Sequence, residues 1–201
     1  MIRNIIFDIG MVLVHFRWKD LMQELGITGE AFDVVSKATV LGPYWNEFDR
    51  SKLTSDEIIE LCCQLAPSYE QQVRLFFTHT GELCHEHPWA AGWVQSFKDA
   101  GYKTYLLSNY ARLSYTSVQP PYRFASVVDG GVISYEVQEI KPEPAIYQIL
   151  LDKYDLKAEE CVFIDDNPVN IDMARQLGFY GIVHRTKEET DQELKKLGIT
   201  V

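Results

Sequence analysis

Four separate segments of this 201-residue sequence carry side chains suited to phosphoryl transfer. In chain order these residues are Asp8 with Gly10, Ser108 with Asn109, Lys141, and Asp165 with Asp166. A carboxylate such as that of Asp8 can act as a nucleophile and form an aspartyl-phosphate, which divides one difficult displacement into two easier ones. The residue types therefore indicate hydrolysis of a phosphate ester through a covalent intermediate.

The same residues offer ligands for Mg²⁺, which prefers hard oxygen atoms in octahedral geometry. Adjacent carboxylates such as Asp165 and Asp166 repel each other and usually require a cation. A metal site is therefore favoured over a role for this pair as helix caps. The Ser108 hydroxyl, the Asn109 amide and the Lys141 ammonium remain to hold phosphate oxygens.

Short apolar runs precede most of these residues and are typical of buried parallel strands. The predicted strands are residues 4–7, 104–107, 161–164 and 180–183. Helical patterns lie between them, at residues 88–100, 144–154 and 169–177. This alternation predicts an α/β fold, a Rossmann-like parallel sheet flanked by helices. In such sheets ligands bind beyond the carboxyl ends of the strands, so the polar residues are expected at one edge.

Residues 17–83 follow a different pattern, because they lack a clear buried strand. Helical patterns cover residues 18–25, 31–38, 54–65 and 69–78. Thr54 and Glu57 form a capping-box pattern before one apolar run. We therefore predict a Rossmann-like core of residues 1–15 and 85–201, with an α-helical cap at 16–84. The segment 187–197 is predicted to be a charged surface helix.

The motifs FDIGMVLV, LLSN, KPEPAIY and VFIDDNPVN resemble the four ordered motifs of haloacid dehalogenase-like hydrolases. The resemblance spans about residues 3 to 185 and includes a helical cap inserted after the first motif. The chain most resembles the branch that contains bacterial α-D-glucose-1-phosphate phosphatases. The resemblance implies a Mg²⁺-dependent phosphatase whose substrate is a small phosphorylated metabolite, such as a sugar phosphate.

Carried over residue by residue, the resemblance implies a nucleophile and a set of metal ligands. Asp8 would be the nucleophile and one ligand of Mg²⁺, and the Gly10 carbonyl would be a second ligand. Asp166 would coordinate the metal directly. Asp165 would bind through water or share the metal, and the order of the two aspartates stays open.

The remaining motif residues are expected to bind the phosphoryl group or to orient the metal ligands. Ser108 and the backbone or amide of Asn109 would bind the phosphoryl group. Lys141 would neutralise Asp8 and the phosphate oxygens as charge develops. Asn170 would orient the Asp165–Asp166 pair without binding the metal itself.

The first motif departs from the family pattern, in which an aspartate two residues after the nucleophile transfers protons. Gly10 occupies that position and has no proton to transfer, whereas general acid–base catalysis contributes about 10²- to 10⁴-fold. Substrates with a good leaving group, such as a sugar phosphorylated at its anomeric carbon, would suffer less. Metal-bound water, a cap residue or His15 are candidates for the missing group.

Gly10 also motivates a second hypothesis, a phospholigand-binding or regulatory protein with impaired turnover. A third is a 2-haloacid dehalogenase, which needs no metal, and the Asp165–Asp166 pair disfavours it. In the predicted cap, Trp45, Glu47 and Arg50 are candidates for contacting a sugar.

Composition limits the other function classes. The formal charge of -10 disfavours nucleic acid as a partner. His79, His85 and His87 lack the cysteine or carboxylate spacing of a closed zinc site. Four cysteines without a CxxC pair favour a reducing cytoplasm. Neither a signal peptide nor a membrane span is predicted, and the expected state is a monomer or homodimer.

Overall fold

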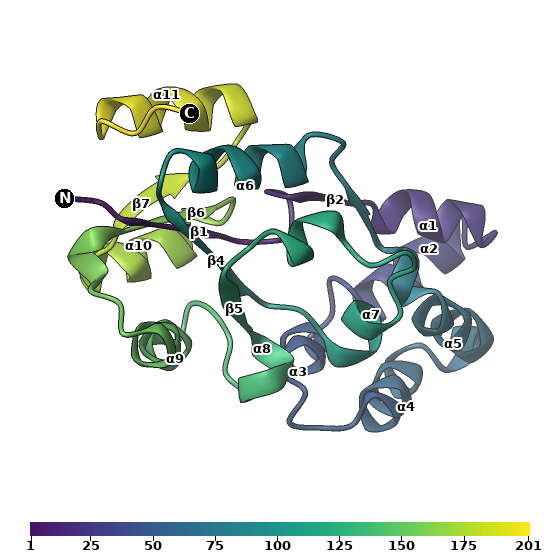
Figure 1. Ribbon diagram of the computed structural model, residues 1–201. Coiled ribbons are helices and arrows are strands. Elements are labelled where there is room, and N and C mark those ends of the chain that lie inside the picture. Colours follow the sequence, from purple (N-terminus) through teal and green to yellow (C-terminus); the bar gives the residue numbers. More distant parts are fainter.

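The computed structural model describes residues 1–201 and contains a five-stranded, fully parallel sheet (Figure 1). Its strands lie in the order β5-β4-β1-β6-β7. In chain order they are β1 (Asn4–Phe7), β4 (Lys103–Ser108), β5 (Gly130–Ile133), β6 (Cys161–Asp165) and β7 (Tyr180–Val183). The prediction of an α/β fold with a Rossmann-like parallel sheet is confirmed.

Alternating side chains of the strands divide the core into two clusters, one on each face of the sheet. On β1, Ile5 and Phe7 belong to the larger cluster, whereas Ile6 belongs to the smaller one. This follows from the two-residue period of a strand. Both faces are buried, which explains why the central strands are mostly apolar.

Helices cover both faces of the sheet. Residues of α6 (Ala90–Asp99) and α11 (Lys187–Lys196) contribute to the larger cluster. The smaller cluster contains residues of α9 (Pro144–Tyr154) and α10 (Pro168–Gln176). Two shorter helices, α7 (Arg112–Thr116) and α8 (Ser134–Val137), follow β4 and β5 in the chain.

Five helices form the segment of residues 17–83, which we call the helical insert. They are α1 (Trp18–Glu24), α2 (Glu30–Ala38), α3 (Trp45–Arg50), α4 (Ser55–Leu65) and α5 (Glu70–Thr78). The predicted capping box is present, since Thr54 and Glu57 exchange side-chain and backbone hydrogen bonds at the start of α4. Figure 1 places these helices beyond the carboxyl end of β1.

The chain enters and leaves the helical insert through a two-stranded antiparallel ribbon. β2 (Val14–Phe16) pairs with β3 (Cys84–Glu86), so that His15 lies opposite His85. The predicted cap boundaries, at residues 15/16 and 84/85, fall inside this ribbon.

Three strands and three helices of the structure were not predicted; the helices are α3, α7 and α8. The run Gly130-Gly131 dilutes the apolar signal of β5, and β2 and β3 have only three residues each. α3, α7 and α8 have only six, five and four residues, which is too short for a helical period to show. No helix has both the length and the apolarity needed to cross a membrane.

Candidate active site

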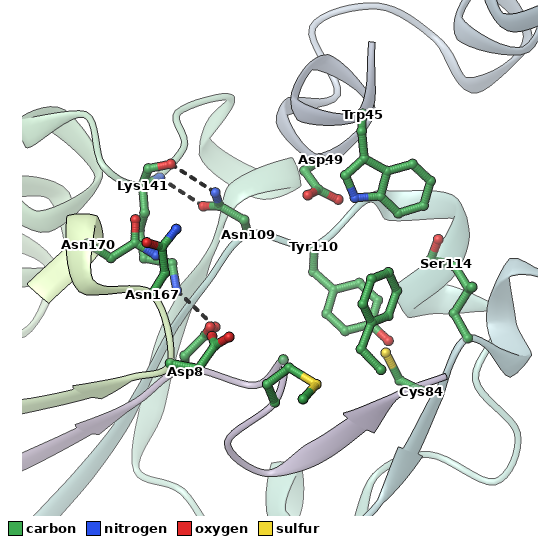
Figure 2. Close-up of a pocket in the computed structure, with 15 residues that line it drawn as sticks. Asp8, Trp45, Asp49, Cys84, Asn109, Tyr110, Ser114, Lys141, Asn167 and Asn170 are labelled. Atoms are coloured by element: carbon green, nitrogen blue, oxygen red, sulfur yellow. Dashed lines mark hydrogen bonds and ion pairs between the residues drawn. The ribbon is translucent and has the colours of Figure 1, made fainter. Parts of the chain in front are cut away.

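A pocket of about 320 Å³ lies beyond the carboxyl end of β1, between the sheet and the helical insert. Figure 2 shows its two walls, with Asp8 and Lys141 on the sheet side and Trp45 and Asp49 on α3. The predicted edge of the sheet is therefore the floor of a pocket that α3 and α7 close from the other side.

Lys141 links the nucleophile candidate to the second carboxylate motif. Its Nζ lies 2.9 Å from Asp8 Oδ1 and 2.6 Å from Asp165 Oδ2. The backbone N–H of Ile9 also donates to Asp8 Oδ1, at 2.7 Å. Both donors bind the same oxygen, Oδ1, and hold it in place at the end of β1.

Asp165 and Asp166 are adjacent in sequence but lie in different environments. Asp165 is fully buried, and its oxygens accept hydrogen bonds from the Asn170 amide, the Asn167 backbone and Lys141. Asp166 is exposed and lines the pocket. Its carboxylate is the more accessible of the two to a ligand in the pocket.

Burial and like charge disfavour ionisation of the floor carboxyls. Desolvation, together with the charge of Asp165, raises the pKa of Asp8 to about 7, although Lys141 opposes the shift. Desolvation and Asp165 also raise the pKa of Asp166. Burial alone would lower the pKa of Lys141, but Asp165 and Asp8 raise it above its ordinary value.

The donor set at the floor fits a divalent cation. Carboxylate oxygens of Asp8, Asp165 and Asp166 all lie within 4.8 Å of one another. One ammonium, that of Lys141, faces these three acids, so the cluster carries excess negative charge when all are ionised. A hard cation with oxygen ligands, such as Mg²⁺, would offset that charge.

Ser108 and Asn109, at the end of β4, lie beside this cluster in different roles. The Ser108 hydroxyl is fully buried beside Asp8 and has no hydrogen-bond partner of good geometry, but the residue does not itself line the pocket. The Asn109 amide donates to the Lys141 carbonyl at 2.9 Å and accepts from the Lys141 N–H at 2.8 Å. The Asn109 side chain thus positions Lys141, rather than being free for a phosphoryl group.

Glycine at position 10 is required neither by space nor by backbone conformation. An added Cβ atom would meet no atom within 4 Å, and the φ angle of Gly10 lies outside the left-handed region. The residue lines the pocket together with Met11, which adopts a φ of 56°. The missing carboxylate is therefore not a consequence of packing.

The wall opposite Asp8 contains groups that the sequence did not reveal. Asp49 and Ser114 line the pocket, and the Ser114 hydroxyl is buried without a hydrogen-bond partner. Cys84 and Tyr110, both buried, line the same pocket (Figure 2). No motif marks any of these positions, because their placement depends on how short elements such as α3 and α7 pack against their neighbours in the fold.

Several other candidates lie away from the pocket. His15 is exposed on the β2–β3 ribbon and does not line the pocket. Of the three residues expected to contact a sugar, Trp45 lines the pocket, whereas Glu47 and Arg50 do not and pair with each other at 3.1 Å. His79, His85 and His87 form no metal-binding group; the one such group is Asp8, Asp165 and Asp166.

Comparisons with known proteins agree with this geometry. The model of the haloacid dehalogenase-like hydrolase family matches residues 2–178. D-ribitol-5-phosphate phosphatase of Bacteroides thetaiotaomicron is 27% identical over 209 residues, which cover 96% of this chain and 97% of the relative. Drimenol cyclase drtB of Aspergillus calidoustus is 24% identical over 200 residues, 98% of this chain, but the chain spans only 37% of that protein.

A solved structure shares the fold across nearly the whole chain. It is a HAD-family enzyme from Bacteroides thetaiotaomicron, crystallised in complex with magnesium and inorganic phosphate. The TM-score is 0.71 at 19% sequence identity, and the match covers 93% of this chain and 96% of the other.

Proposed function

This chain belongs to the haloacid dehalogenase-like hydrolase family, and we propose that it is a Mg²⁺-dependent phosphatase of small phosphorylated metabolites. One observation carries the proposal. Asp8 directly follows β1 at the floor of the pocket, with Lys141 beside it and two further carboxylates within 4.8 Å. The phosphatase relative and the solved complex with magnesium and phosphate support the same reaction class.

In this function the chain's own residues divide the work between attack and charge neutralisation. The Asp8 carboxylate attacks phosphorus and forms an aspartyl-phosphate, which water then hydrolyses. The Lys141 ammonium and the Ser108 hydroxyl bind the phosphoryl oxygens as charge develops. Asp8, the Gly10 carbonyl and Asp166 would hold Mg²⁺, with Asp165 behind them. When bound, the ion neutralises the acids and polarises the phosphoryl group.

The pocket also bears on the substrate. Its volume of about 320 Å³ suits a small metabolite rather than a macromolecule. In the proposed organisation, residues 16–84 act as a cap over a core of residues 1–15 and 85–201, and α3 presents Trp45 to the substrate. A sugar phosphate such as glucose 1-phosphate is our proposed substrate, since an anomeric leaving group depends less on a proton donor at position 10 than a simple alkyl leaving group does.

Gly10 gives one observation in favour of a second function, a phospholigand-binding protein with impaired turnover. Such a protein would be stabilised by phosphorylated ligands without releasing phosphate. The 2-haloacid dehalogenase hypothesis receives less support, because three clustered carboxylates suit a metal-assisted reaction rather than one without metal.

Phosphate release from sugar phosphates, nucleotides and p-nitrophenyl phosphate, with Mg²⁺ and with chelator, tests the proposal. We expect metal-dependent turnover in the wild type and none above background in Asp8→Asn. Asp172→Asn is the matched control, because Asp172 is exposed on α10 and pairs only with Arg175. Full activity of Asp8→Asn would contradict the mechanism. Ligand-induced stabilisation without turnover in the wild type would favour the binding protein.

A further inference from the structure

Hydrolysis through Asp8 requires two proton transfers that the floor of the pocket does not provide. The ester oxygen that leaves phosphorus needs a proton, and the water that attacks the aspartyl-phosphate must lose one. Gly10 has no side chain for this task. Lys141 is held between Asp8 and Asp165, within 3 Å of each. The group that transfers protons must therefore come from another wall.

The wall opposite Asp8 offers three titratable side chains, and only one suits proton transfer near neutral pH. Burial raises the pKa of Cys84 to about 11 and the pKa of Tyr110 well above its usual value. Both groups stay protonated at neutral pH and cannot act as bases. The remaining group is the carboxyl of Asp49.

Asp49 is half-buried on α3, and Figure 2 shows its carboxyl directed into the pocket from the side opposite Asp8. Two contacts fix the helix in that position. The Ser134 hydroxyl donates to the Asp49 carbonyl at 2.6 Å. The neighbouring Arg50 binds both oxygens of Glu143, at 2.6 and 2.7 Å. Because Glu143 lies two residues after Lys141, α3 is joined to the segment that carries the cation.

The electrostatics of the pocket match this carboxyl to proton transfer. Burial raises the pKa of Asp49 to about 7, the Ala111 backbone N–H opposes the shift, Asp8 adds to it and Lys141 reduces it. A general acid–base group works best with a pKa near the working pH. The facing groups with charge or titratable protons are Asp8, Lys141, Cys84 and Tyr110.

We propose that Asp49, presented by α3 across the pocket from Asp8, is the general acid and base of the hydrolysis. The inference rests on the proposed phosphatase function. In the first step the bond from Asp8 oxygen to phosphorus forms, the phosphorus–ester oxygen bond breaks, and the leaving oxygen takes the Asp49 proton. In the second step water attacks phosphorus, the Asp8 bond to phosphorus breaks, and Asp49 accepts the proton that water loses.

Asp49→Asn, assayed with Mg²⁺, is the first test. Alkyl phosphates need both proton transfers, so their kcat should fall about 10²- to 10⁴-fold. With p-nitrophenyl phosphate, whose leaving group needs no proton, one equivalent of nitrophenol should still be released rapidly. The following turnover should be slow, and the phosphoenzyme should accumulate. Glu47→Gln is the control on the same helix, because Glu47 pairs with Arg50 outside the pocket.

A second variant separates catalysis from structure. The open space at Gly10 allows a carboxylate to be introduced into the pocket from a position two residues after Asp8. Gly10→Asp in the Asp49→Asn background should restore turnover of alkyl phosphates at least 10-fold, which a purely structural role for Asp49 would not allow. In the wild type, kcat should decline as the pH rises through about 7, because Asp49 loses the proton that it donates. This decline should be absent in the Asp49→Asn single variant.

The outcomes distinguish this inference from the function on which it rests. An active wild type, an inactive Asp8→Asn and an Asp49→Asn variant with normal kcat would overturn the role of Asp49 alone. A rise in KM without a change in kcat would do the same, because it would make Asp49 a substrate-binding residue. Absence of turnover in the wild type on every substrate would overturn both proposals.

Discussion

Lys141 is the single cation in direct contact with two buried carboxylates, and its side chain is almost completely enclosed. Its backbone is held by the two hydrogen bonds of the Asn109 amide. A buried ion pair contributes little when it is compared with an apolar replacement of the whole group, but removal of one partner leaves a charge uncompensated. Lys141 is therefore important for stability as well as for the proposed chemistry.

Lys141→Met should reduce the free energy of unfolding by about 3 to 5 kcal/mol, since it leaves Asp8 and Asp165 facing each other without a cation. Urea denaturation in the presence of chelator at pH 7.5 measures the change. Lys196→Met, which removes an exposed partner of Glu193, should leave the midpoint unchanged. A loss below 1 kcal/mol in Lys141→Met would mean that the acids are neutralised by protonation instead.

The sequence located the floor of the site but not its opposite wall. Asp8, Asp165 and Lys141 stand in recognisable motifs, and their strands or loops must meet at one edge of a parallel sheet. Asp49 stands in no motif, and its role depends on how α3 packs against α4 and α8. Arg50 was expected to contact a sugar, but its guanidinium forms ion pairs with Glu143 and Glu47.

At the scale of elements, α3 determines the shape of the pocket although it is only six residues long. A helix of this length is unstable in isolation and depends on tertiary contacts. The bidentate pair of Arg50 with Glu143 supplies one such contact, and Arg50 hydrogen bonding lowers the pKa of Glu143 to about 2. The position of α3 thus depends on an ion pair with the segment before α9.

A double-mutant cycle of Arg50→Met and Glu143→Gln should give an interaction energy of about 0.5 to 3 kcal/mol. The pair is bidentate and the Arg50 side chain is only 11% exposed, which favours a value above that of a surface pair. Arg74 with Glu70, an exposed pair within α5, is the control cycle. Equal interaction energies in the two cycles would show that the contact does not hold α3.

The long periodic elements were predictable, whereas the short ones were not. Residues 144–154 were predicted as a helix with proline in the first turn, and α9 has these bounds. β5 was missed because it begins with two glycines. A Cβ atom at Gly131 would lie 2.8 Å from Leu106, so the close approach of β4 excludes a side chain there. Such tertiary requirements leave no periodic signal.

At the scale of the whole molecule, the half-buried carboxyl of Asp49 links stability to pH. The pKa of Asp49 is about 7 in the folded protein, against an ordinary value of 3.8 that applies to the unfolded chain. Between about pH 4 and pH 7 the folded state therefore binds more protons than the unfolded state. The stability that protonated Asp49 provides is fully present below about pH 4. It is lost as the pH rises through 7.

Asp49→Asn should therefore raise the thermal midpoint relative to the wild type by an amount that grows between pH 4 and pH 8. The comparison isolates one group, because all other titrating side chains are present in both proteins. Calorimetry with chelator, at several pH values, measures the difference. A difference that stays constant over this range would mean that Asp49 titrates alike in the folded and unfolded chains.

The β2–β3 ribbon has an evolutionary consequence. Since the helical insert begins and ends on two neighbouring strands, the rest of the fold connects to it as it would to an ordinary loop. Such a segment can be exchanged between genes as a cassette, because the replacement needs only two ends that lie side by side. Selection can in this way diversify the wall that meets the substrate while the inherited carboxylates at the end of β1 stay unchanged.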